Sequence, residues 1–277
     1  MSLNNFSLNG KVAVITGAAG LLGSQHINAV LQNEGIAILI DIDRQKLNLC
    51  IKKYNYFLKK KKLVIFNSDI TKESSIKVIL KKIIKDYSKV DILINNAAVD
   101  YKLDKDHKKI IKKTRLETFD LNIWKKDINV GLTGALICTK IFGQQMVKQG
   151  GGVILNIASD LSFISPDHRL YNKSDDYLKR KVVKPISYSV VKHGVVGLTK
   201  YTANYWARRN IRCNAIAPGG IDNNQPVKFK NKIAKLIPMG RMAGRNEYES
   251  SILYLISDAS SYMNGAVLVV DGGRTVI

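Results

Sequence analysis

A short apolar segment followed by a glycine-rich turn most strongly limits the folds open to this chain. Residues 12–15 read VAVI, a continuously apolar and mostly β-branched run that is typical of a strand buried on both faces. The next eight residues, 16–23, read TGAAGLLG, and a helical pattern then extends to about Asn33. Strand, glycine turn and helix in this order predict an α/β unit built on a parallel sheet.

The same turn is suited to a dinucleotide. Gly17 and Gly20 let the backbone approach a pyrophosphate, Gly23 allows close packing of helix on strand, and the helix N-terminus offers free N–H groups. A tight turn without a ligand is the alternative interpretation.

The residue at the end of the second expected strand bears on the choice between NAD and NADP. The apolar run 36–40 ends at Asp41, which follows Gly20 by 21 residues. At that spacing a carboxylate accepts hydrogen bonds from the adenosine ribose and repels a 2′-phosphate. We therefore expect NAD rather than NADP, although the nearby Arg44 weakens the argument. Asp43 either shares the role of Asp41 or begins the next helix.

Further buried strands alternate with helical segments along the rest of the chain. Expected strands are 63–66, 90–94, 153–157, 212–217 and 267–270, and expected helices are 72–87, 123–149, one containing Tyr188, and 247–256. The pattern predicts the α/β class, with one doubly wound domain over residues 1–277 and a parallel sheet of about seven strands. Ligands of such sheets lie beyond the carboxyl ends of the strands.

Tyr188 and Lys192 are four residues apart, so on a helix they leave the same face. Ser187 is the expected N-cap of that helix. A phenol has a pKa of about 10, and a lysine ammonium held close lowers it. A shift of about 3 units takes about 4 kcal/mol and gives a group that exchanges protons near neutral pH. Alone, Tyr-x-x-x-Lys is a weak signal, and an exposed helical pair is the alternative.

Composition excludes several classes of protein. Hydrophobic residues make up 45% of the 277, enough for a full core, and no run is long enough for a membrane span. The polar first ten residues lack a signal-peptide core, and three cysteines cannot form a disulfide framework. We expect a cytoplasmic protein with no membrane association.

The formal charge of +22 is compatible with nucleic-acid binding or with attraction for anionic small molecules. The lysines are scattered, and the densest run, 59–62, falls between a helix and a strand, so we expect no nucleic-acid partner. No His, Cys, Asp or Glu cluster has metal-ligand spacing, and Asp100, Asp104 and Asp106 lack the glycine of a calcium loop. We expect no metal.

Taken together, these motifs resemble the short-chain dehydrogenase/reductase family over nearly the whole chain. They are TGxxxxxG at 16–23, Asp69-Ile70, NNAA at 95–98, Ser159, Tyr188-x-x-x-Lys192, Asn214 with Pro218-Gly219, and DGG at 271–273. The segments 184–194 and 237–242 further resemble a bacterial branch that accompanies genes for flagellin glycans and other surface-polysaccharide sugars. The resemblance implies a Rossmann domain, an NAD(P)-dependent oxidoreductase and a dimer or tetramer packed through the long helix and the Tyr188 helix.

The resemblance also implies roles for individual residues. Tyr188 is the expected general acid/base, Lys192 lowers its pKa and bonds the nicotinamide ribose, and Ser159 holds the substrate oxygen. Asp69 and Ile70 flank the adenine. The full cofactor-binding set is Gly17, Ala19, Gly20, Leu21, Leu22, Asp41, Ile42, Asp69, Ile70, Asn95, Asn96, Ala97, Tyr188, Lys192, Pro218, Gly219 and Ile221.

The sequence departs from the family pattern at three places. Leu21-Leu22-Gly23 stands where Gly-x-Gly is usual. Gly131 stands where the family has a catalytic asparagine, and Asn129 lies about 200° away around a regular helix. The 29 residues from Ser159 to Tyr188 exceed the family's usual spacing, so 165–184 is an insertion beside the active site.

Two segments are candidates for substrate recognition: the insertion at 165–184 and a lid at 218–245. Within them we single out His168, Arg169, Tyr171, Arg241 and Arg245 as possible anion or hydroxyl ligands, with solvated surface residues as the alternative. His193 should leave another helix face than Lys192, which favours a packing role.

We therefore expect an enzyme that interconverts a secondary alcohol and a ketone, with a sugar, sugar-phosphate or nucleotide-sugar substrate of surface-glycan biosynthesis. One alternative is a reductase of 3-oxoacyl or small keto substrates. Another is a weakly catalytic nucleotide-binding partner protein, suggested by Gly131. Substrate identity and reaction direction do not follow from the sequence.

Overall fold

A computed structural model describes residues 3–99, 114–171 and 182–277. Seven strands form one parallel sheet in the order β3-β2-β1-β4-β5-β6-β7. The strands are β1 Val12–Thr16, β2 Ile36–Asp41, β3 Leu63–Asn67, β4 Ile92–Asn95, β5 Gly152–Ile157, β6 Ile211–Pro218 and β7 Val267–Val270. The chain winds outward from β1 to β3 and then in the other direction from β4 to β7. The prediction of a single α/β domain with a doubly wound parallel sheet of about seven strands is confirmed.

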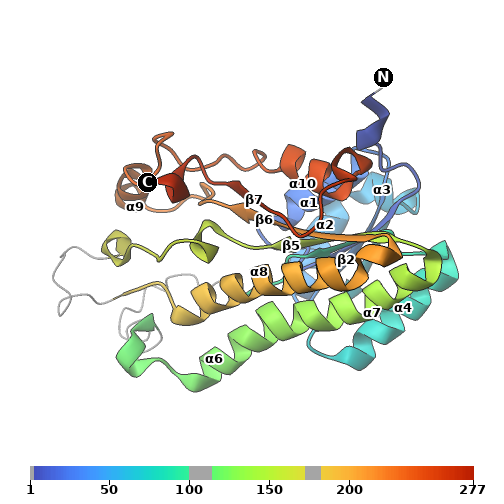
Figure 1. Cartoon of the computed structure of the whole chain (residues 1–277), viewed down its shortest axis with the longest axis horizontal. Helices are drawn as coiled ribbons and strands as arrows, with labels where there is room; N and C mark the ends of the chain where they lie inside the picture. The colour runs from blue at the N-terminus through green and yellow to red at the C-terminus, as the bar shows by residue number, and fades with distance from the viewer. Residues whose placement is uncertain (1–2, 100–113, 172–181) are drawn as a thin grey trace.

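Helices cover both faces of the sheet (Figure 1). Helices α1, α2 and α10 lie on one face, and α4, α7 and α8 lie on the other, where α7 and α8 run side by side. The α-helices are α1 Gly23–Leu31, α2 Arg44–Lys53, α3 Asn55–Lys59, α4 Glu73–Tyr87, α6 Leu121–Ile128, α7 Gly134–Gln149, α8 Ile186–Trp206, α9 Val227–Ala234 and α10 Glu249–Ile256.

The continuous apolar strands are explained by two cores, one on each side of the sheet. In β1, Ala13 and Ile15 belong to the core under α1 and α10, whereas Val12 and Val14 belong to the core under α4 and α7. All five β1 residues are buried. Because successive side chains of a strand point to opposite faces, a strand between two helix layers must be apolar throughout.

The long predicted helix at 123–149 is interrupted. Helix α6 ends at Ile128, a π-helical turn η3 spans Asn129–Thr133, and α7 begins at Gly134, whose N–H donates to the carbonyl of Asn129 five residues earlier. Single π-turns inside α-helices occur frequently at functional sites.

The predicted N-cap of the Tyr188 helix is wrong. Helix α8 begins at Ile186, directly after Pro185, and Ser187 lies inside the first turn. There its hydroxyl donates to Asp127 Oδ2 of α6 at 2.5 Å, with both side chains buried. The sequence favours Ser187 as an N-cap because serine commonly caps the N-terminus of a helix. In the structure, a buried carboxylate from another helix binds its hydroxyl instead.

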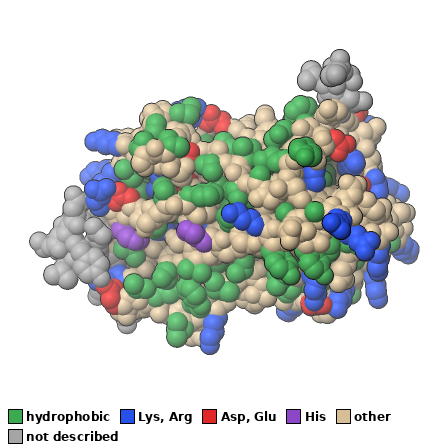
Figure 2. All heavy atoms as spheres, in the orientation of Figure 1, with side chains coloured by type: hydrophobic (Ala, Val, Ile, Leu, Met, Phe, Trp, Pro, Cys, Tyr) green, Lys and Arg blue, Asp and Glu red, His purple; other side chains and the backbone are tan. Residues whose placement is uncertain are grey.

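The surface carries its charge at several separate places (Figure 2). Within the described ranges, no helix combines the length and hydropathy of a membrane crossing, and no group of three or more His, Cys, Asp and Glu side chains could hold a metal ion. Asp100, Asp104 and Asp106 lie outside those ranges. A cavity of about 350 Å³, lined in part by Lys11, Asp91 and Arg212, lies at the amino ends of the strands, opposite the site described next.

Candidate active site

The glycine turn after β1 has a conformation that depends on glycine. Gly17 has φ +60°, and a Cβ there would lie 2.6 Å from Cα of Ala97. A Cβ on Gly23 would overlap the carbonyl oxygen of Ala18. The turn therefore lies tightly against the end of β4. A residue with a side chain at position 17 or 23 would prevent this close packing.

Side chains from β4 and α1 hold this turn. Asn96 donates from Nδ2 to the carbonyls of Thr16 (3.1 Å) and Gly17 (2.8 Å), and its Oδ1 lies 3.1 Å from Nε2 of His26. Because the amide nitrogen of Asn96 is the donor to the turn, its oxygen must accept, which makes His26 Nε2 a donor. Burial lowers the pKa of His26 to about 4, so the imidazole is neutral. His26 and Asn96 thus form a neutral chain of hydrogen bonds behind the turn.

The front of the turn offers backbone donors. In the described part of the chain, the N–H groups of Leu21 and Leu22 have no acceptor, and both residues precede the first turn of α1. The Leu21 side chain is exposed. Unsatisfied N–H groups at a helix N-terminus bind anions. The turn therefore fits the pyrophosphate of a dinucleotide.

Asp41 at the end of β2 is joined to the same turn. Its Oδ2 accepts the N–H of Ala19 and its Oδ1 accepts the N–H of Asp43, each at 2.9 Å. Each carboxylate oxygen keeps a second lone pair that a ribose hydroxyl can use. Asp43 is the N-cap of α2, accepting from Lys46 N–H, so it begins the next helix as one of the two alternatives predicts. Ile42 between them is exposed.

The residues expected at the adenine and along the cofactor lie at the ends of β3 and β4. Asp69 Oδ1 accepts from Thr71 N–H and hydroxyl, and Ile70 is buried against the start of α7. Asn95 donates to Thr139 Oγ1 and Asn156 Oδ1, while its own Oδ1 is buried without a partner among the residues described. The Asn95 side chain thus joins the end of β4 to α7 and β5.

Ser159 lies two residues beyond the end of β5 and is buried. Its hydroxyl donates to Asp160 Oδ1 at 2.7 Å and accepts the N–H of Leu161 at 3.2 Å. The next turn is closed by Ser162, whose Oγ accepts from Ser159 N–H and donates to the carbonyl of Lys192 at 2.9 Å. Ser159 and Lys192, which are far apart in sequence, are thereby connected through one serine.

Tyr188 and Lys192 lie on the α8 face that packs against β5. Lys192 Nζ is buried, donates to the carbonyl of Ile157 at 2.7 Å and lies 5.8 Å from the centroid of the Tyr188 ring. The ammonium is thus close to the ring and anchored at the carboxyl end of the strand that leads to Ser159. A second ammonium, that of Lys184, lies over the same Tyr188 ring, with Nζ 3.9 Å from the ring centroid.

The end of β6 bounds the site on the remaining side. Gly219 donates its N–H to Val270 and accepts at its carbonyl from Tyr248 Oη at 3.1 Å. Pro218 ends the strand, and Ile221 is buried and pairs with Ala243. All three residues expected at the nicotinamide end therefore lie at the carboxyl edge of the sheet.

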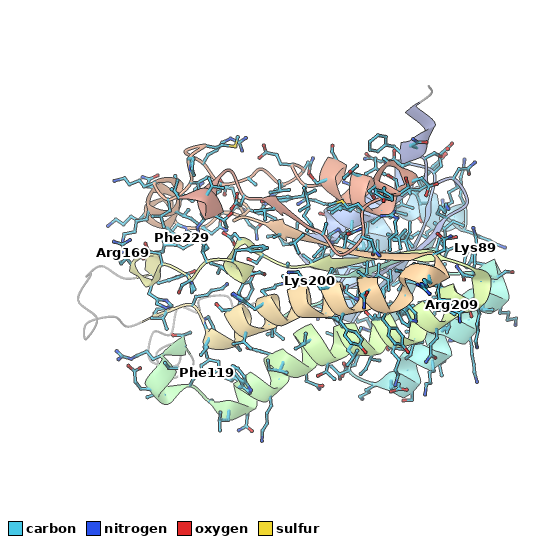
Figure 3. All side chains as sticks on the ribbon, in the orientation of Figure 1. Lys89, Phe119, Arg169, Lys200, Arg209 and Phe229 are labelled. Atoms are coloured by element: carbon cyan, nitrogen blue, oxygen red, sulfur yellow. The ribbon has the colours of Figure 1, made fainter. Side chains whose placement is uncertain are left out.

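The described start of the insertion packs on the segment predicted as a lid. Leu170 and Tyr171 join an apolar cluster with Phe229, Ile233 and residues near them, and the rings of Tyr171 and Phe229 have centroids 5.7 Å apart. Figure 3 shows Arg169 and Phe229 at the same end of the molecule, and Lys89 and Arg209 at the opposite end. Residues 172–181 of the insertion lie outside the described ranges.

The arginines considered as anion ligands have protein partners. Arg169 is paired with Asp167 at 2.7 Å, Arg241 is paired with Glu247 at 2.6 Å, and Arg245 donates to Asn223 at 3.0 Å. His193 is exposed and bonds the carbonyl of Ser189 through Nδ1, so within this chain it does not have the packing role that we expected.

Comparison with known proteins agrees with this arrangement. A family model described as enoyl-(acyl carrier protein) reductase matches residues 24–275, most of the chain. The chain belongs to the short-chain dehydrogenase/reductase family. It is accordingly an NAD(P)-dependent oxidoreductase acting on CH–OH groups.

Curated members of the short-chain dehydrogenase/reductase family are similar over their full length. The 2-dehydro-3-deoxy-D-gluconate 5-dehydrogenase of Bacillus subtilis is 34% identical, with 97% of this chain and 96% of the relative covered. The post-translational flagellin modification protein A of Campylobacter coli is 31% identical (96% and 98%). The 3-oxoacyl-[acyl-carrier-protein] reductase of Thermotoga maritima is 31% identical (97% and 99%).

Solved members of the family have the same fold. A short-chain dehydrogenase from Leptospira borgpetersenii with bound NAD+ has a TM-score of 0.83 at 27% identity, with 99% of this chain and 96% of that chain covered. A gluconate 5-dehydrogenase from Burkholderia cenocepacia in complex with NADP and tartrate has a TM-score of 0.83 at 23% identity, with both chains covered completely.

At the position where the resemblance implies an asparagine, this chain has Gly131. Asn129, two positions before Gly131, is exposed, so the π-turn does not carry its amide into the site. Sequence reasoning also missed Lys184, Asp160, Arg274 and His26. Only Lys184 carried a local signal, because it lies four residues before Tyr188.

Proposed function

We propose that this chain is an NAD-dependent dehydrogenase that interconverts a secondary alcohol and a ketone on a sugar or sugar derivative of surface-glycan biosynthesis. The observation that supports the proposal is the position of Lys192, whose Nζ lies 5.8 Å from the centroid of the Tyr188 ring and is anchored at the carboxyl end of β5, the strand that leads to Ser159. Lys192 Nζ bonds Ile157, and Ser162 links Ser159 to Lys192.

In this proposal the protein moves one proton and holds one oxygen. Lys192 stabilises the charged form of the Tyr188 phenol, which takes the proton of the substrate hydroxyl during oxidation and returns it during reduction. Ser159 contacts the substrate oxygen. The nicotinamide, when bound, supplies or accepts the hydride.

The choice of NAD is supported by Asp41. Its carboxylate follows β2, bonds the glycine turn through Ala19 and carries a negative charge where NADP has its phosphate. Arg44 begins α2 and is exposed, which does not match a cation held ready for that phosphate.

The choice of a carbohydrate is supported by the relatives that act on a gluconate derivative or modify flagellin, and by two segments beside the site. Residues 168–171 and the 218–245 segment pack together through Leu170, Tyr171 and Phe229. Apart from Pro218, the last residue of β6, these residues lie outside the sheet, so their shape can suit a particular substrate without disturbing the sheet.

A panel of substrates tests the proposal. Purified protein is assayed with NAD and NADP on D-gluconate, xylitol, nucleotide sugars and 3-oxoacyl thioesters. We expect turnover of at least one sugar with NAD, and a loss of roughly 10²–10⁴-fold in Tyr188→Phe with NAD affinity unchanged. Turnover of only the acyl substrates would favour the reductase alternative, which the Thermotoga relative represents. Tight NAD binding without turnover would favour the nucleotide-binding alternative.

We also propose that the chain forms a homodimer or homotetramer through α7 and α8. Hydrophobic side chains gather over these helices (Figure 2), and Leu136, Tyr201 and Tyr205 are at least half exposed. The rings of Tyr201 and Tyr205 stack with centroids 5.8 Å apart, giving a flat aromatic surface. A second copy would cover it. In sedimentation, the parent should be an oligomer and the double variant Tyr201→Lys/Tyr205→Lys a smaller species. A monomeric parent would contradict the proposal.

A further inference from the structure

A buried ion pair connects the end of the chain to the residue after Ser159. Arg274 Nη1 lies 2.6 Å from Asp160 Oδ2, and the two side chains are 7% and 5% exposed. Asp160 begins the turn η4 (Asp160–Ser162), and Arg274 begins the C-terminal turn η9 (Arg274–Val276). Burying two charges has a desolvation cost that the attraction only partly offsets, so stability alone does not account for such a pair.

The carboxylate oxygen of Asp160 that does not bond Arg274 bonds Ser159 instead. Asp160 Oδ1 accepts from the Ser159 hydroxyl at 2.7 Å and from Leu161 N–H at 2.8 Å. A serine hydroxyl has one hydrogen, and here it points to Asp160. Since Ser159 Oγ also accepts from Leu161 at 3.2 Å, its oxygen is held from two sides and the direction of its hydrogen is set.

The other end of the pair depends on the DGG motif at 271–273. Asp271 Oδ1 accepts the N–H of Gly273 and Oδ2 accepts the N–H of Thr275, at 2.9 and 2.8 Å. Gly273 has φ +89°, a conformation that favours glycine. This turn directs Arg274 back under the carboxyl edge of the sheet, and the C-terminus lies at that end of the molecule (Figure 1).

We propose that Asp160 and Arg274 are positioning residues of the active site, which hold the Ser159 hydroxyl in place and make the C-terminal turn part of the catalytic apparatus. The inference rests on the role of Ser159 in the proposed function. After its bonds to Asp160 and Leu161, Ser159 Oγ has one lone pair left, to which a substrate hydroxyl can donate. Its hydrogen stays on Asp160 and Leu161 N–H keeps the oxygen atom in place, so the remaining lone pair keeps one direction.

The pair also determines how strongly Asp160 holds that hydrogen. Arg274 occupies Oδ2, so the carboxylate cannot turn away from Ser159 without breaking a buried charge-assisted hydrogen bond. Without Arg274, only the N–H of Leu161 holds the Asp160 carboxylate, so the carboxylate and the Ser159 hydroxyl are oriented less firmly. The expected consequence is a lower kcat, since the hydroxyl is no longer presented in one geometry to the reacting oxygen.

Kinetics of Arg274 variants test the proposal. Arg274→Met leaves a buried carboxylate alone, so it is measured beside the double variant Asp160→Asn/Arg274→Met, which leaves no unpaired charge. We expect both to lower kcat for the sugar substrate at least tenfold, with the Kd for NAD within twofold of the parent. Arg274→Lys, which keeps a cation, should restore at least a third of the parent kcat.

Arg212 provides the matched control. It is a partly buried arginine with three bonds to neighbouring chain segments, to Ser257, Ser260 and Met263, but it lies at the amino end of β6. Arg212→Met should lower the melting temperature and leave kcat unchanged. A kcat within twofold of the parent in the double variant, a loss of kcat in Arg212→Met as large as in Arg274→Met, or no rescue by lysine would each overturn the proposal.

A readout without substrate separates this inference from the proposed function. In a crystal structure of the double variant, the Ser159 side chain should adopt a different or a mixed χ1 rotamer. An unchanged, fully ordered Ser159 rotamer would overturn the inference even if the parent oxidises sugars. A moved Ser159 in a protein that turns over no sugar would support the inference and contradict only the proposed substrate.

Discussion

A Cβ atom on Gly131 would lie 2.6 Å from Cγ1 of Val191. Gly131 belongs to the π-turn η3 and Val191 is the residue before Lys192 on α8, so the contact joins the two helices beside the site. Val191 is 5% exposed and packs in a small core with Ala158, Val195 and Ala215. The valine fills the space in which a side chain at position 131 would begin, so this packing admits glycine at position 131.

We expect Gly131→Asn to destabilise the protein, because overpacking a core typically costs about 1–3 kcal/mol. Gly131→Asn/Val191→Ser should recover most of that loss, since the smaller side chain at 191 makes room. Urea unfolding of the two single variants and the double variant gives the coupling energy. Additive effects would contradict the contact.

Cofactor choice should depend on Asp41. Asp41→Ala removes the charge and the acceptor of Ala19 N–H, and should lower the ratio of kcat/KM for NAD to that for NADP at least tenfold. Asp41→Asn, which keeps an acceptor and loses the charge, separates the two contributions. Initial rates with both cofactors are the measurement, and equal kcat/KM values in the parent would contradict our choice of NAD.

The sequence was sufficient for the features that depend on local pattern. Apolar strands buried on both faces identified the sheet, and the spacings of Gly17, Asp41, Tyr188 and Lys192 identified residues that the fold then brings to one edge. The Asp160–Arg274 pair could not be predicted, because its members are 114 residues apart and no local pattern matches one charge to another at that range. Ser187 was misassigned for the same reason: its partner Asp127 is 60 residues away.

Lys184 should influence the pH dependence of turnover. Its ammonium lies 3.9 Å from the centroid of the Tyr188 ring, closer than that of Lys192, and a nearby cation favours a phenolate. We expect Lys184→Met to move the rise of kcat/KM for alcohol oxidation to higher pH, by up to about one unit. Lys200→Met is the control, because Lys200 is exposed on the same helix (Figure 3). Superimposable profiles for the parent and Lys184→Met would exclude an effect on Tyr188.

His26 should make the folded protein sensitive to mild acid. Burial lowers its pKa from 6.5 to about 4, although its hydrogen bond with Asn96 opposes the shift. Between these two values the unfolded chain binds a proton that the folded protein does not, so stability is present above about pH 6.5 and falls as the pH is lowered toward about 4. The shift corresponds to a loss of about 3 kcal/mol over that interval.

Urea unfolding at pH 7.5, 6 and 5 should show this fall in the parent and a smaller one in His26→Gln, with His193→Gln as the exposed control. Because His26 of the folded protein stays neutral down to about pH 4, the turn that it supports through Asn96 should stay intact, and the affinity of the parent for NAD should fall only as the pH approaches that value. Equal acid sensitivity in the parent and His26→Gln would show that other groups are responsible.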